Sequence, residues 1–374
     1  MRNKVAFITA SPMTVKAFLI PFITELAKNH EIHVISSWQG NESFLPEGVK
    51  MVNFPIKREP SIFDDLLSLV QLIRILKAEK YDIVHSFTPK AGFIGQIASF
   101  LSGVKLRFHT FTGQVWATQT GLTRFFLKSL DKITAFLASS VLVDSPSQES
   151  FLIENKVVLP CKSQVLGQGS ISGVNLSKFQ YSQEKSDKIR SKLQLSGNEF
   201  VFLYAGRLKI DKGVPELLTA FKNVAKKIPA VLVIVGADED GLLPEVYKTE
   251  GAIFCGFSDD ISAYFSAADL LCLPSHREGF GNVVIEAAAC GLPTLASRIY
   301  GLSDAIVDNE TGILHQVKDA KDIEFKMLSL CQNKPQLEMM SERALQRVYS
   351  EFSEHVIVEE FIKFYELQER KLPK

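Results

Sequence analysis

The feature that most constrains this chain is a repeated alternation of short apolar runs with longer amphipathic stretches. Alternation of this kind is typical of right-handed β-α-β units, which build a parallel sheet with helices on its faces. The pattern runs through the first half of the chain and then restarts after a polar interval. The predicted strands are Val5–Ala10, Glu31–Ser36, Val49–Pro55, Asp82–Phe87, Lys105–Thr110, Ser140–Val143, Val201–Ala205, Val231–Val235, Ile253–Phe257, Leu270–Leu273 and Thr294–Ala296.

The stretches between the strands have helical periodicity, and Val15–Lys28, Ile62–Glu79 and Leu122–Ala138 are the clearest of them. A chain of 374 residues is long for a single hydrophobic core, so two domains are expected. The polar interval at residues 181–198 has few large apolar groups, and we place a linker between about 175 and 198.

We therefore predict an α/β protein with two doubly wound, Rossmann-like domains, at 1–180 and 198–354. A C-terminal helix at about 355–374 can pack back on the first domain. In such sheets ligands bind at the carboxyl ends of the strands, so the two domains should face a shared cleft.

Charge and cysteine content limit the classes of binding partner and the cellular compartment that fit this chain. Through Gln180 the chain has 19 lysines and arginines against 13 aspartates and glutamates, although the whole chain is neutral. A basic first half suggests an anionic partner, which could be nucleic acid, an acidic membrane lipid or a phosphorylated ligand. The five cysteines form no C-x-x-C pair, which indicates a reducing compartment without a disulfide framework or a zinc site. No window has the 18 apolar residues needed to cross a bilayer.

The segment from Tyr204 to Gly213, YAGRLKIDKG, follows the first strand of the second half. Gly206 lets the backbone approach a ligand, and a helix is expected to begin near Pro215. Arg207 and Lys212 can both lie at the carboxyl end of the strand. An arginine fork and a lysine beside a helix N-terminus suit a diphosphate, although a solvated polar loop would give the same pattern.

A second segment, HREGFGNVVIEAAAC at 276–290, follows the predicted strand Leu270–Leu273. Its glycines allow tight turns and leave backbone N–H groups available at the start of a helix. Glu278 lies in the loop and Glu286 lies near the helix start. Two carboxylates with this spacing suit a polyol held at two points, whereas either one alone would more simply be a surface glutamate.

Together the two segments, G-R-L-x(3)-K-G and E-G-F-G-x(4)-E-A-x(3)-G-x-P, resemble the large family of retaining glycosyltransferases often called family 4, which have the GT-B fold. The resemblance implies that Arg207 and Lys212 hold the donor diphosphate, that Glu278 contacts the donor sugar and that Glu286 holds the ribose. It also implies that the backbone around Cys255 to Ser258 reads the base. The donor-binding residues expected on this basis are Gly206, Arg207, Lys212, Cys255, Gly256, Phe257, Glu278, Gly279, Phe280, Gly281, Asn282, Val283 and Glu286.

The first half adds His109, which opens the stretch HTFTG at a predicted strand end. A lone histidine is more often structural, but in the family a histidine at this place borders the donor sugar, so the resemblance implies a catalytic role beside Glu278, Arg207 and Lys212. The family usually has a glycine pair after its first strand, and here the loop Ser11–Lys16 has no glycine. With its HTFTG stretch the chain looks like a subgroup of bacterial polysaccharide glycosyltransferases that act on lipid-linked acceptors. The acceptor-side candidates are Ser11, Met13, Thr14, Thr112 and Gly113.

Two further patterns bear on metal and membrane binding. Asp238-Glu-Asp240 has the D-x-D form that binds Mg²⁺ in other glycosyltransferase folds, but we interpret it as a solvated loop and expect no metal and no cofactor. In 122–138, Arg124, Lys128 and Lys132 recur every four residues beside many aromatic and aliphatic side chains. A helix with basic and aromatic faces can lie on an anionic membrane surface, although part of it must pack on the sheet.

With the resemblance to family 4, these observations predict a retaining, metal-independent enzyme on the cytoplasmic face of the membrane. It would move a hexose or N-acetylhexosamine from a UDP-sugar to a polyprenyl-diphosphate-linked saccharide of O-antigen or capsule, with no nucleic-acid partner. The alternatives are an enzyme like UDP-GlcNAc 2-epimerase, which shares the fold and needs no acceptor, and a non-catalytic nucleotide-sugar-binding protein. Hydrolysis of a donor would exclude the last of these.

Overall fold

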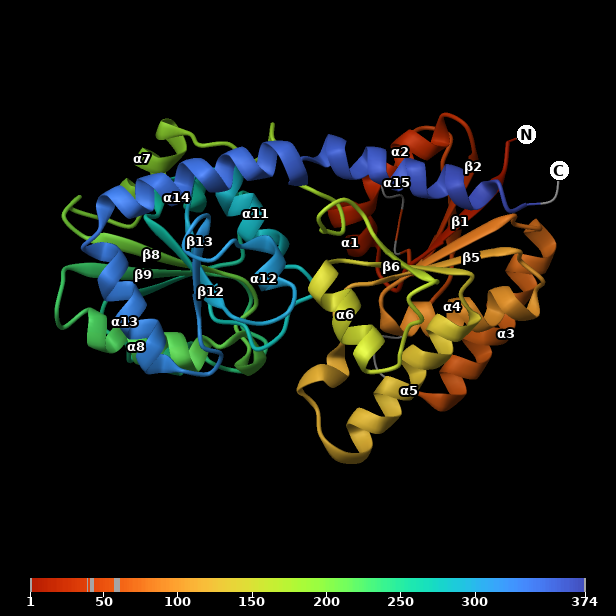
Figure 1. The fold of residues 1–374 in the computed structure, drawn as a ribbon, viewed down its shortest axis with the longest axis horizontal. Coiled ribbons are helices and arrows are strands. Elements are labelled where there is room, and N and C mark those ends of the chain that lie inside the picture. The colour runs from red at the N-terminus through yellow and green to blue at the C-terminus, as the bar shows by residue number, and fades with distance from the viewer. Residues whose placement is uncertain (1, 39, 41–43, 57–60, 373–374) are drawn as a thin grey trace. The chain divides into compact units, whose positions relative to one another are not determined.

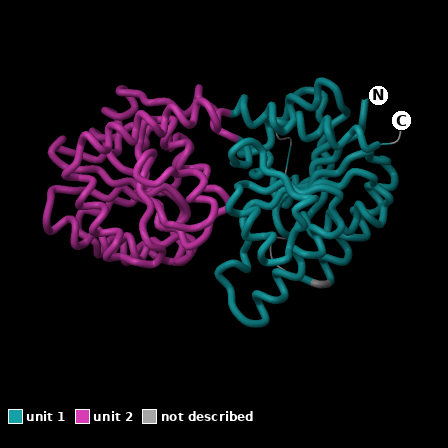
Figure 2. Tube along the Cα trace, in the orientation of Figure 1, with its two compact units in different colours: residues 1–172, 354–374 teal, residues 173–353 magenta. Residues whose placement is uncertain are grey.

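The computed structural model describes residues 2–38, 40, 44–56 and 61–372, and these divide into two compact units (Figures 1 and 2). The first unit contains residues 1–172 and 354–374, and the second contains 173–353. The segment predicted as a linker lies within the second unit and contains helix α7 (Gln183–Lys192). That helix is held by the buried Ile189 and by an ion pair from Arg190 to Asp269, which the low apolar content of the segment did not reveal.

The first unit is built on a seven-stranded parallel sheet with the order β3-β2-β1-β4-β5-β6-β7. The order reverses between β1 and β4, which makes this pair the switch point of the sheet. Strand β7 is too short to show a strand pattern in the sequence. The strands are β1 (Lys4–Ile8), β2 (Glu31–Ser36), β3 (Lys50–Asn53), β4 (Ile83–Phe87), β5 (Leu106–Phe111), β6 (Ser140–Val143) and β7 (Ser163–Val165).

Helices cover this sheet, and the amphipathic stretches of the sequence become α2, α3 and α5. The first stretch begins earlier than expected, because Ser11 caps a helical turn and Pro12 suits its first position. The helical elements are α1 (Pro12–Thr14), η1 (Val15–Leu19), α2 (Ile20–Ala27), α3 (Ile62–Glu79), α4 (Pro89–Leu101), η2 (Val115–Thr118), α5 (Gly121–Leu137), α6 (Pro146–Glu154) and α15 (Glu354–Glu369).

The last helix, α15, belongs to the core of the first unit. Its Phe361 stacks on Phe22 of α2 with ring centroids 4.1 Å apart. The hydroxyl of Tyr365 lies 2.9 Å from His85 Nδ1 of β4, and the two form a hydrogen bond. The final segment of the chain thus completes the hydrophobic core of the N-terminal sheet.

The second unit contains a six-stranded parallel sheet with the order β10-β9-β8-β11-β12-β13. Its switch point lies between β8 and β11. The strands are β8 (Phe200–Ala205), β9 (Ala230–Val235), β10 (Ala252–Gly256), β11 (Leu270–Leu273), β12 (Thr294–Ser297) and β13 (Gly312–His315), the last of which the sequence did not predict.

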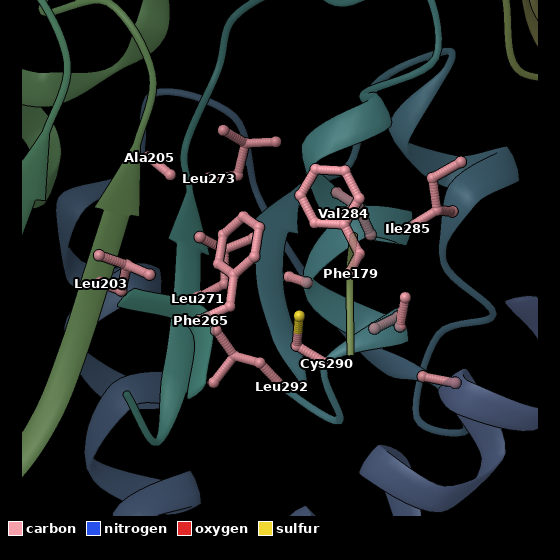
Figure 3. Close-up of a cluster of buried hydrophobic side chains, with 14 of the residues drawn as sticks. Phe179, Leu203, Ala205, Phe265, Leu271, Leu273, Val284, Ile285, Cys290 and Leu292 are labelled. Atoms are coloured by element: carbon pink, nitrogen blue, oxygen red, sulfur yellow. The ribbon is translucent and has the colours of Figure 1, made fainter. Parts of the chain in front are cut away.

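Both faces of this sheet are covered by helices, and a large apolar cluster fills one side between β8, β11 and α11 (Figure 3). Leu203 and Leu271 meet Phe265 and Val284 in this cluster, and all four are almost fully buried. The helical elements are η3 (Ile210–Lys212), α8 (Val214–Val224), α9 (Leu243–Tyr247), α10 (Ile261–Ala267), α11 (Asn282–Ala289), α12 (Leu302–Ala305), α13 (Ala320–Cys331), α14 (Lys334–Arg347) and η4 (Val348–Phe352).

Candidate active site

The two motif loops of the second unit meet because their strands are direct neighbours. Strand β8 pairs with β11 in parallel, with Leu203 opposite Leu271, so both strands end at the same edge of the sheet. The loop after β8 carries Arg207 and Lys212, and the loop after β11 carries Glu278. The switch point of a doubly wound sheet is where ligands bind, so the topology makes this edge the candidate site.

Lys212 and Glu278 form the centre of the site. Lys212 Nζ lies 2.6 Å from Glu278 Oε1, and the buried Ser275 donates its hydroxyl to the same oxygen at 2.8 Å. The side chains of the lysine and the glutamate are 15% and 18% exposed. The pair therefore presents a fixed cation beside a fixed anion, and each still has a face open to solvent.

Gly213 explains how the two loops can approach so closely. It has φ of 70°, and a Cβ atom there would lie 2.0 Å from the carbonyl oxygen of Pro274 at the end of β11. Any side chain would push the two loops apart, so this glycine sets the position of Lys212 relative to Glu278.

Arg207 is nearly half exposed and pairs with Glu239 at 3.1 Å. Lys209, which the sequence analysis did not single out, lies 3.3 Å from the same carboxylate. The loop that contains Glu239 is exposed, as expected, but its acids are engaged. Asp238 accepts hydrogen bonds from the backbone of Leu242 and Leu243 at the start of α9, at 2.9 and 3.1 Å.

Asp240 accepts a hydrogen bond from the backbone N–H of Ile210 at 2.9 Å. The D-x-D carboxylates thus fix their own loop and the start of η3. Among the described residues, no group of three or more histidine, cysteine, aspartate or glutamate side chains is placed to hold a metal ion.

Helix α11 begins at the same edge, with Gly281 at φ of 90° before Asn282 and Val283. Glu286 lies one turn further along and is mostly buried, and burial raises the pKa of its carboxyl group to about 7. Within the described part of the chain, this carboxyl makes no hydrogen bond or ion pair. When it is ionised, a buried carboxylate without a protein partner is suited to accept hydrogen bonds from a bound polyol.

The remaining donor-side candidates differ in what they can offer. Phe280 is 2% exposed and its ring packs on Phe352, so only its backbone, like that of the neighbouring Gly279, can face a ligand. Cys255 and Gly256 end strand β10, and the side chain of Phe257 after them is 72% exposed. An exposed aromatic ring at a strand end is suited to contact a flat base.

In the first unit, His109 lies in β5 and is 1% exposed. Its Nδ1 atom lies 2.9 Å from the hydroxyl of Ser86 on β4, and burial lowers the pKa of the ring to about 3. The imidazole is therefore neutral at physiological pH. It can donate or accept a hydrogen bond, but it cannot act as a cation.

The acceptor-side candidates lie at the carboxyl ends of β1 and β5. Ser11 caps α1 by accepting from the backbone of Met13, whose side chain is 63% exposed, and Thr14 ends that helical turn. Thr112 and Gly113 follow β5, and Gly113 has φ of 99°.

Asp144 is a buried acid that sequence reasoning missed. It follows β6 at this same edge of the sheet, and burial raises its carboxyl pKa well above the usual range. Its Oδ1 atom is buried without a hydrogen-bond partner among the described residues. An acid placed immediately after the apolar run Val141–Val143 was the available signal.

In helix α5 the three cations Arg124, Lys128 and Lys132 do not share one exposed basic face. Arg124 and Lys128 lie over the ring of Trp116, at 5.2 and 5.4 Å, and Lys128 donates to Asn155 Oδ1 at 2.9 Å. Cation–π contacts and this hydrogen bond turn the two cations toward η2 and α6, while Lys132 stays exposed.

Apart from Thr123 and Lys132, the large exposed side chains of α5 are apolar. These apolar residues are between 42% and 87% exposed and recur at helical spacing along the element. They are Leu122, Phe125, Phe126, Ile133 and Phe136, and we call them the α5 apolar row. Among the described residues, no helix combines the length and apolar character needed to cross a bilayer.

Comparison with solved structures supports the architecture. HepE of Anabaena in complex with UDP-glucose superposes with a TM-score of 0.81 over 98% of this chain and 100% of that chain, at 19% identity. Sucrose-phosphate synthase from Thermosynechococcus elongatus gives a TM-score of 0.82 over 99% of this chain and 100% of that chain, at 20% identity. Two doubly wound parallel sheets with these likenesses define the GT-B class of fold.

Sequence comparison gives the family. Residues 4–139 match the model described as glycosyl transferase 4-like, and residues 185–347 match that of glycosyl transferases group 1. CapM of Staphylococcus aureus, a capsular polysaccharide biosynthesis glycosyltransferase, is 34% identical over 346 residues, which cover 90% of each chain. The Escherichia coli UDP-Gal:alpha-D-GlcNAc-diphosphoundecaprenol alpha-1,3-galactosyltransferase is 30% identical over 324 residues, which cover 83% of this chain and 82% of that protein.

The chain belongs to the group 1, family 4-like glycosyltransferases, and it is therefore a sugar-transferring enzyme. Its relatives place it among the bacterial glycosyltransferases of polysaccharide biosynthesis.

Proposed function

We propose that the protein transfers a hexose or N-acetylhexosamine from a UDP-sugar, with retention of configuration, to a polyprenyl-diphosphate-linked saccharide. The observation that carries the proposal is the Lys212–Glu278 pair at the switch point of the second sheet. A diphosphate needs cations and a sugar ring needs hydroxyl acceptors, and this edge offers both within a few ångströms.

The cations would stabilise the leaving group. As the bond to the anomeric carbon breaks, negative charge develops on the diphosphate, and we propose that Lys212, Arg207 and the N-terminus of α11 stabilise it. Arg207 now pairs with Glu239, but both side chains are exposed enough to separate at little cost when a diphosphate arrives. Glu278 would hold sugar hydroxyls and Glu286 the ribose.

For retention we propose a front-face displacement assisted by the leaving phosphate, because no side chain of the site is placed as an evident nucleophile. The reacting acceptor hydroxyl would lose its proton to the departing phosphate oxygen. His109 would border the donor sugar as a neutral hydrogen-bonding group.

The acceptor class is supported by relatives. The Escherichia coli protein is named for a diphosphoundecaprenol-linked acceptor, and a Campylobacter jejuni relative, 25% identical over 381 residues, is named as an N,N'-diacetylbacillosaminyl-diphospho-undecaprenol alpha-1,3-N-acetylgalactosaminyltransferase. Both names give α-linked products. We extend the lipid-linked acceptor to this chain, with capsule or O-antigen assembly as its setting.

A donor and acceptor screen tests the proposal. The purified enzyme is incubated with UDP-Glc, UDP-Gal, UDP-GlcNAc and UDP-GalNAc, each with and without undecaprenyl-diphosphate-linked GlcNAc, and products are identified by mass spectrometry and by the anomeric NMR coupling. Transfer to the lipid-linked sugar with an α linkage is expected. Conversion of UDP-GlcNAc to its C2 epimer without an acceptor would favour the epimerase alternative, and no consumption of any donor would favour a binding protein.

We also propose that the protein docks on the cytoplasmic face of the membrane through the α5 apolar row. Helix α5 begins at the carboxyl edge of the first sheet, where His109 lies, so a bilayer at this helix would bring the lipid-linked acceptor close to that edge. The only acidic residue of α5 is Asp131, which is buried and accepts a hydrogen bond from Trp116, so the exposed face of the helix has no anionic group to repel acidic lipids.

Vesicle cosedimentation tests the docking surface. Replacing Phe125 and Phe136 by serine should weaken binding to vesicles with anionic lipid at least tenfold, since each large apolar side chain contributes about 1.5–3 kcal/mol when it leaves water. The control is Phe325→Ser on α13 of the second unit, where the side chain is 69% exposed, and binding should not change. If the double variant binds like wild type, the row is not the docking surface.

A further inference from the structure

The residues around His109 bury its ring and also form hydrogen bonds with it, because a chain of polar groups reaches its Nδ1 atom. Gln96 of α4 places Nε2 at 2.7 Å from the carbonyl oxygen of Phe108 and at 2.9 Å from the hydroxyl of Ser86. That hydroxyl in turn lies 2.9 Å from His109 Nδ1. Gln96 and Ser86 are both completely buried, so water does not compete for these contacts.

The direction of this chain follows from what each atom can do. A carbonyl oxygen can only accept, so the Gln96 atom beside Phe108 must be the nitrogen, and its second hydrogen points to the Ser86 oxygen. The hydroxyl hydrogen of Ser86 then has two possible acceptors, His109 Nδ1 at 2.9 Å and the Phe108 carbonyl at 3.3 Å. A carbonyl oxygen can accept two hydrogen bonds, so the one from Gln96 does not exclude it, but the ring nitrogen is the closer acceptor.

We infer that Ser86 and Gln96 hold His109 in the tautomer with the proton on Nε2. Nδ1 then accepts from Ser86, and Nε2–H is the donor of a neutral imidazole. Burial, which lowers the ring pKa to about 3, keeps a second proton off the ring at physiological pH. Ser86 and Gln96 are thus positioning residues that act through His109.

The orientation of the ring is restricted as well. A Cβ atom on Gly92, in the first turn of α4, would lie 2.2 Å from His109 Cε1 and 2.7 Å from Nδ1. The ring of Phe111 packs against the imidazole nearly at right angles, with centroids 4.5 Å apart. A glycine in a helix is otherwise unfavourable, so its use here marks the space that the imidazole needs.

The assignment of the tautomer depends only on residues of the first unit. Its consequence for catalysis rests on the proposed contact of His109 with the donor sugar. With Nε2–H fixed, the ring can donate to a sugar oxygen but cannot accept a proton there. A ring that changed tautomer would present an acceptor at Nε2 and would lose that hydrogen bond. The loss should lower kcat about threefold to tenfold.

Nitrogen NMR on protein labelled with ¹⁵N-histidine tests the inference, with His109→Ala used to assign one of the seven histidines. In wild type, His109 should show a protonated Nε2 and an unprotonated Nδ1. Ser86→Ala should raise the population with Nδ1 protonated and lower kcat about threefold to tenfold with a smaller change in KM for the donor. The control is Ser99→Ala on the same helix as Gln96, a buried serine whose hydroxyl bonds back to Gly95, and it should leave both readings unchanged.

If Ser86→Ala does not fold, Gln96→Met provides the same comparison, because it removes the donor that orients the Ser86 hydroxyl. The inference is overturned if Nδ1 carries the proton in wild type, or if neither variant changes the tautomer. A changed tautomer with unchanged kcat would confirm the role of Ser86 and Gln96 but would refute the proposed contact between His109 and the donor sugar.

Discussion

Replacing Glu278 by alanine should affect both catalysis and stability, because the same carboxylate is assigned to the donor sugar and pairs with Lys212. At 2.6 Å and an effective dielectric constant of about 20, the Coulomb attraction is about 6 kcal/mol, most of which offsets the desolvation of two largely buried charges. A net contribution of about 1.5–3 kcal/mol remains, as is usual for hydrogen bonds between charged groups. The melting temperature should fall by roughly 3–12 °C.

The decrease in kcat/KM of the Glu278→Ala enzyme should be larger than destabilisation alone would cause in an enzyme that is still folded. Loss of one charge-assisted contact to the sugar corresponds to a decrease in kcat/KM of roughly tenfold to a hundredfold. Steady-state kinetics, below the melting temperature of every variant, separate this effect from unfolding. Glu324→Ala is the matched control, since Glu324 pairs with Lys227 at 2.7 Å on the surface of the same unit. It should lower stability without changing kcat/KM.

A double-mutant cycle with Lys212→Ala completes the test. If the two groups act as a pair, the double variant should lose less stability than the sum of the single losses, by about 1.5–3 kcal/mol. Additive losses would show that the ion pair contributes nothing to the fold. A Glu278→Ala enzyme within about twofold of wild-type kcat/KM would refute the assignment of this carboxylate to the donor.

Three further predictions concern the same unit. Burial raises the pKa of Glu286 to about 7, and hydrogen bonds from ribose hydroxyls favour the ionised carboxylate. UDP binding at about pH 6 should therefore release a proton, which calorimetry in buffers of different ionisation enthalpy measures. The affinity for UDP should rise with pH up to neutrality. Glu286→Gln should remove this proton release, and its persistence would contradict the assignment. Transfer activity should survive EDTA, and activity abolished by chelation and restored by Mg²⁺ would return Asp238 and Asp240 to the metal-site hypothesis. Gly213→Ala should destabilise the unit by about 2 kcal/mol or more in chemical denaturation, because its φ is positive and Pro274 leaves no space for a Cβ atom, and an unchanged midpoint would contradict this interpretation.

The alternation of apolar runs and helical stretches was enough to predict most strands of both sheets. Strand β2 and strand β11 have the predicted bounds, because buried parallel strands are largely apolar runs, and Asp269 and Pro274 flank the run of β11. Strands β7 and β13 were missed because they are short and lie at sheet edges, where pairing with a neighbour rather than the local sequence decides that they are extended.

The motifs also indicated the chemistry of the site. An arginine and a lysine after β8, a glutamate after β11 and a second glutamate in α11 indicated the edge that we propose binds the donor, since side chains that follow parallel strands gather at one edge of a sheet. What the spacing could not show is that Lys212 and Glu278 are partners, because that contact depends on β8 and β11 being neighbours in the sheet order.

The sequence by itself thus determined the fold class, the family and the residue types of the site, because periodicity and motif spacing are local properties of the chain. Only the tertiary structure decided which side chains face one another. It turned Arg124 and Lys128 onto Trp116 and left the α5 apolar row outside, although helical periodicity alone allowed either face to be exposed. It also brought Ser86 and Gln96 to His109, since contacts between neighbouring strands and a crossing helix depend on packing that no local pattern encodes.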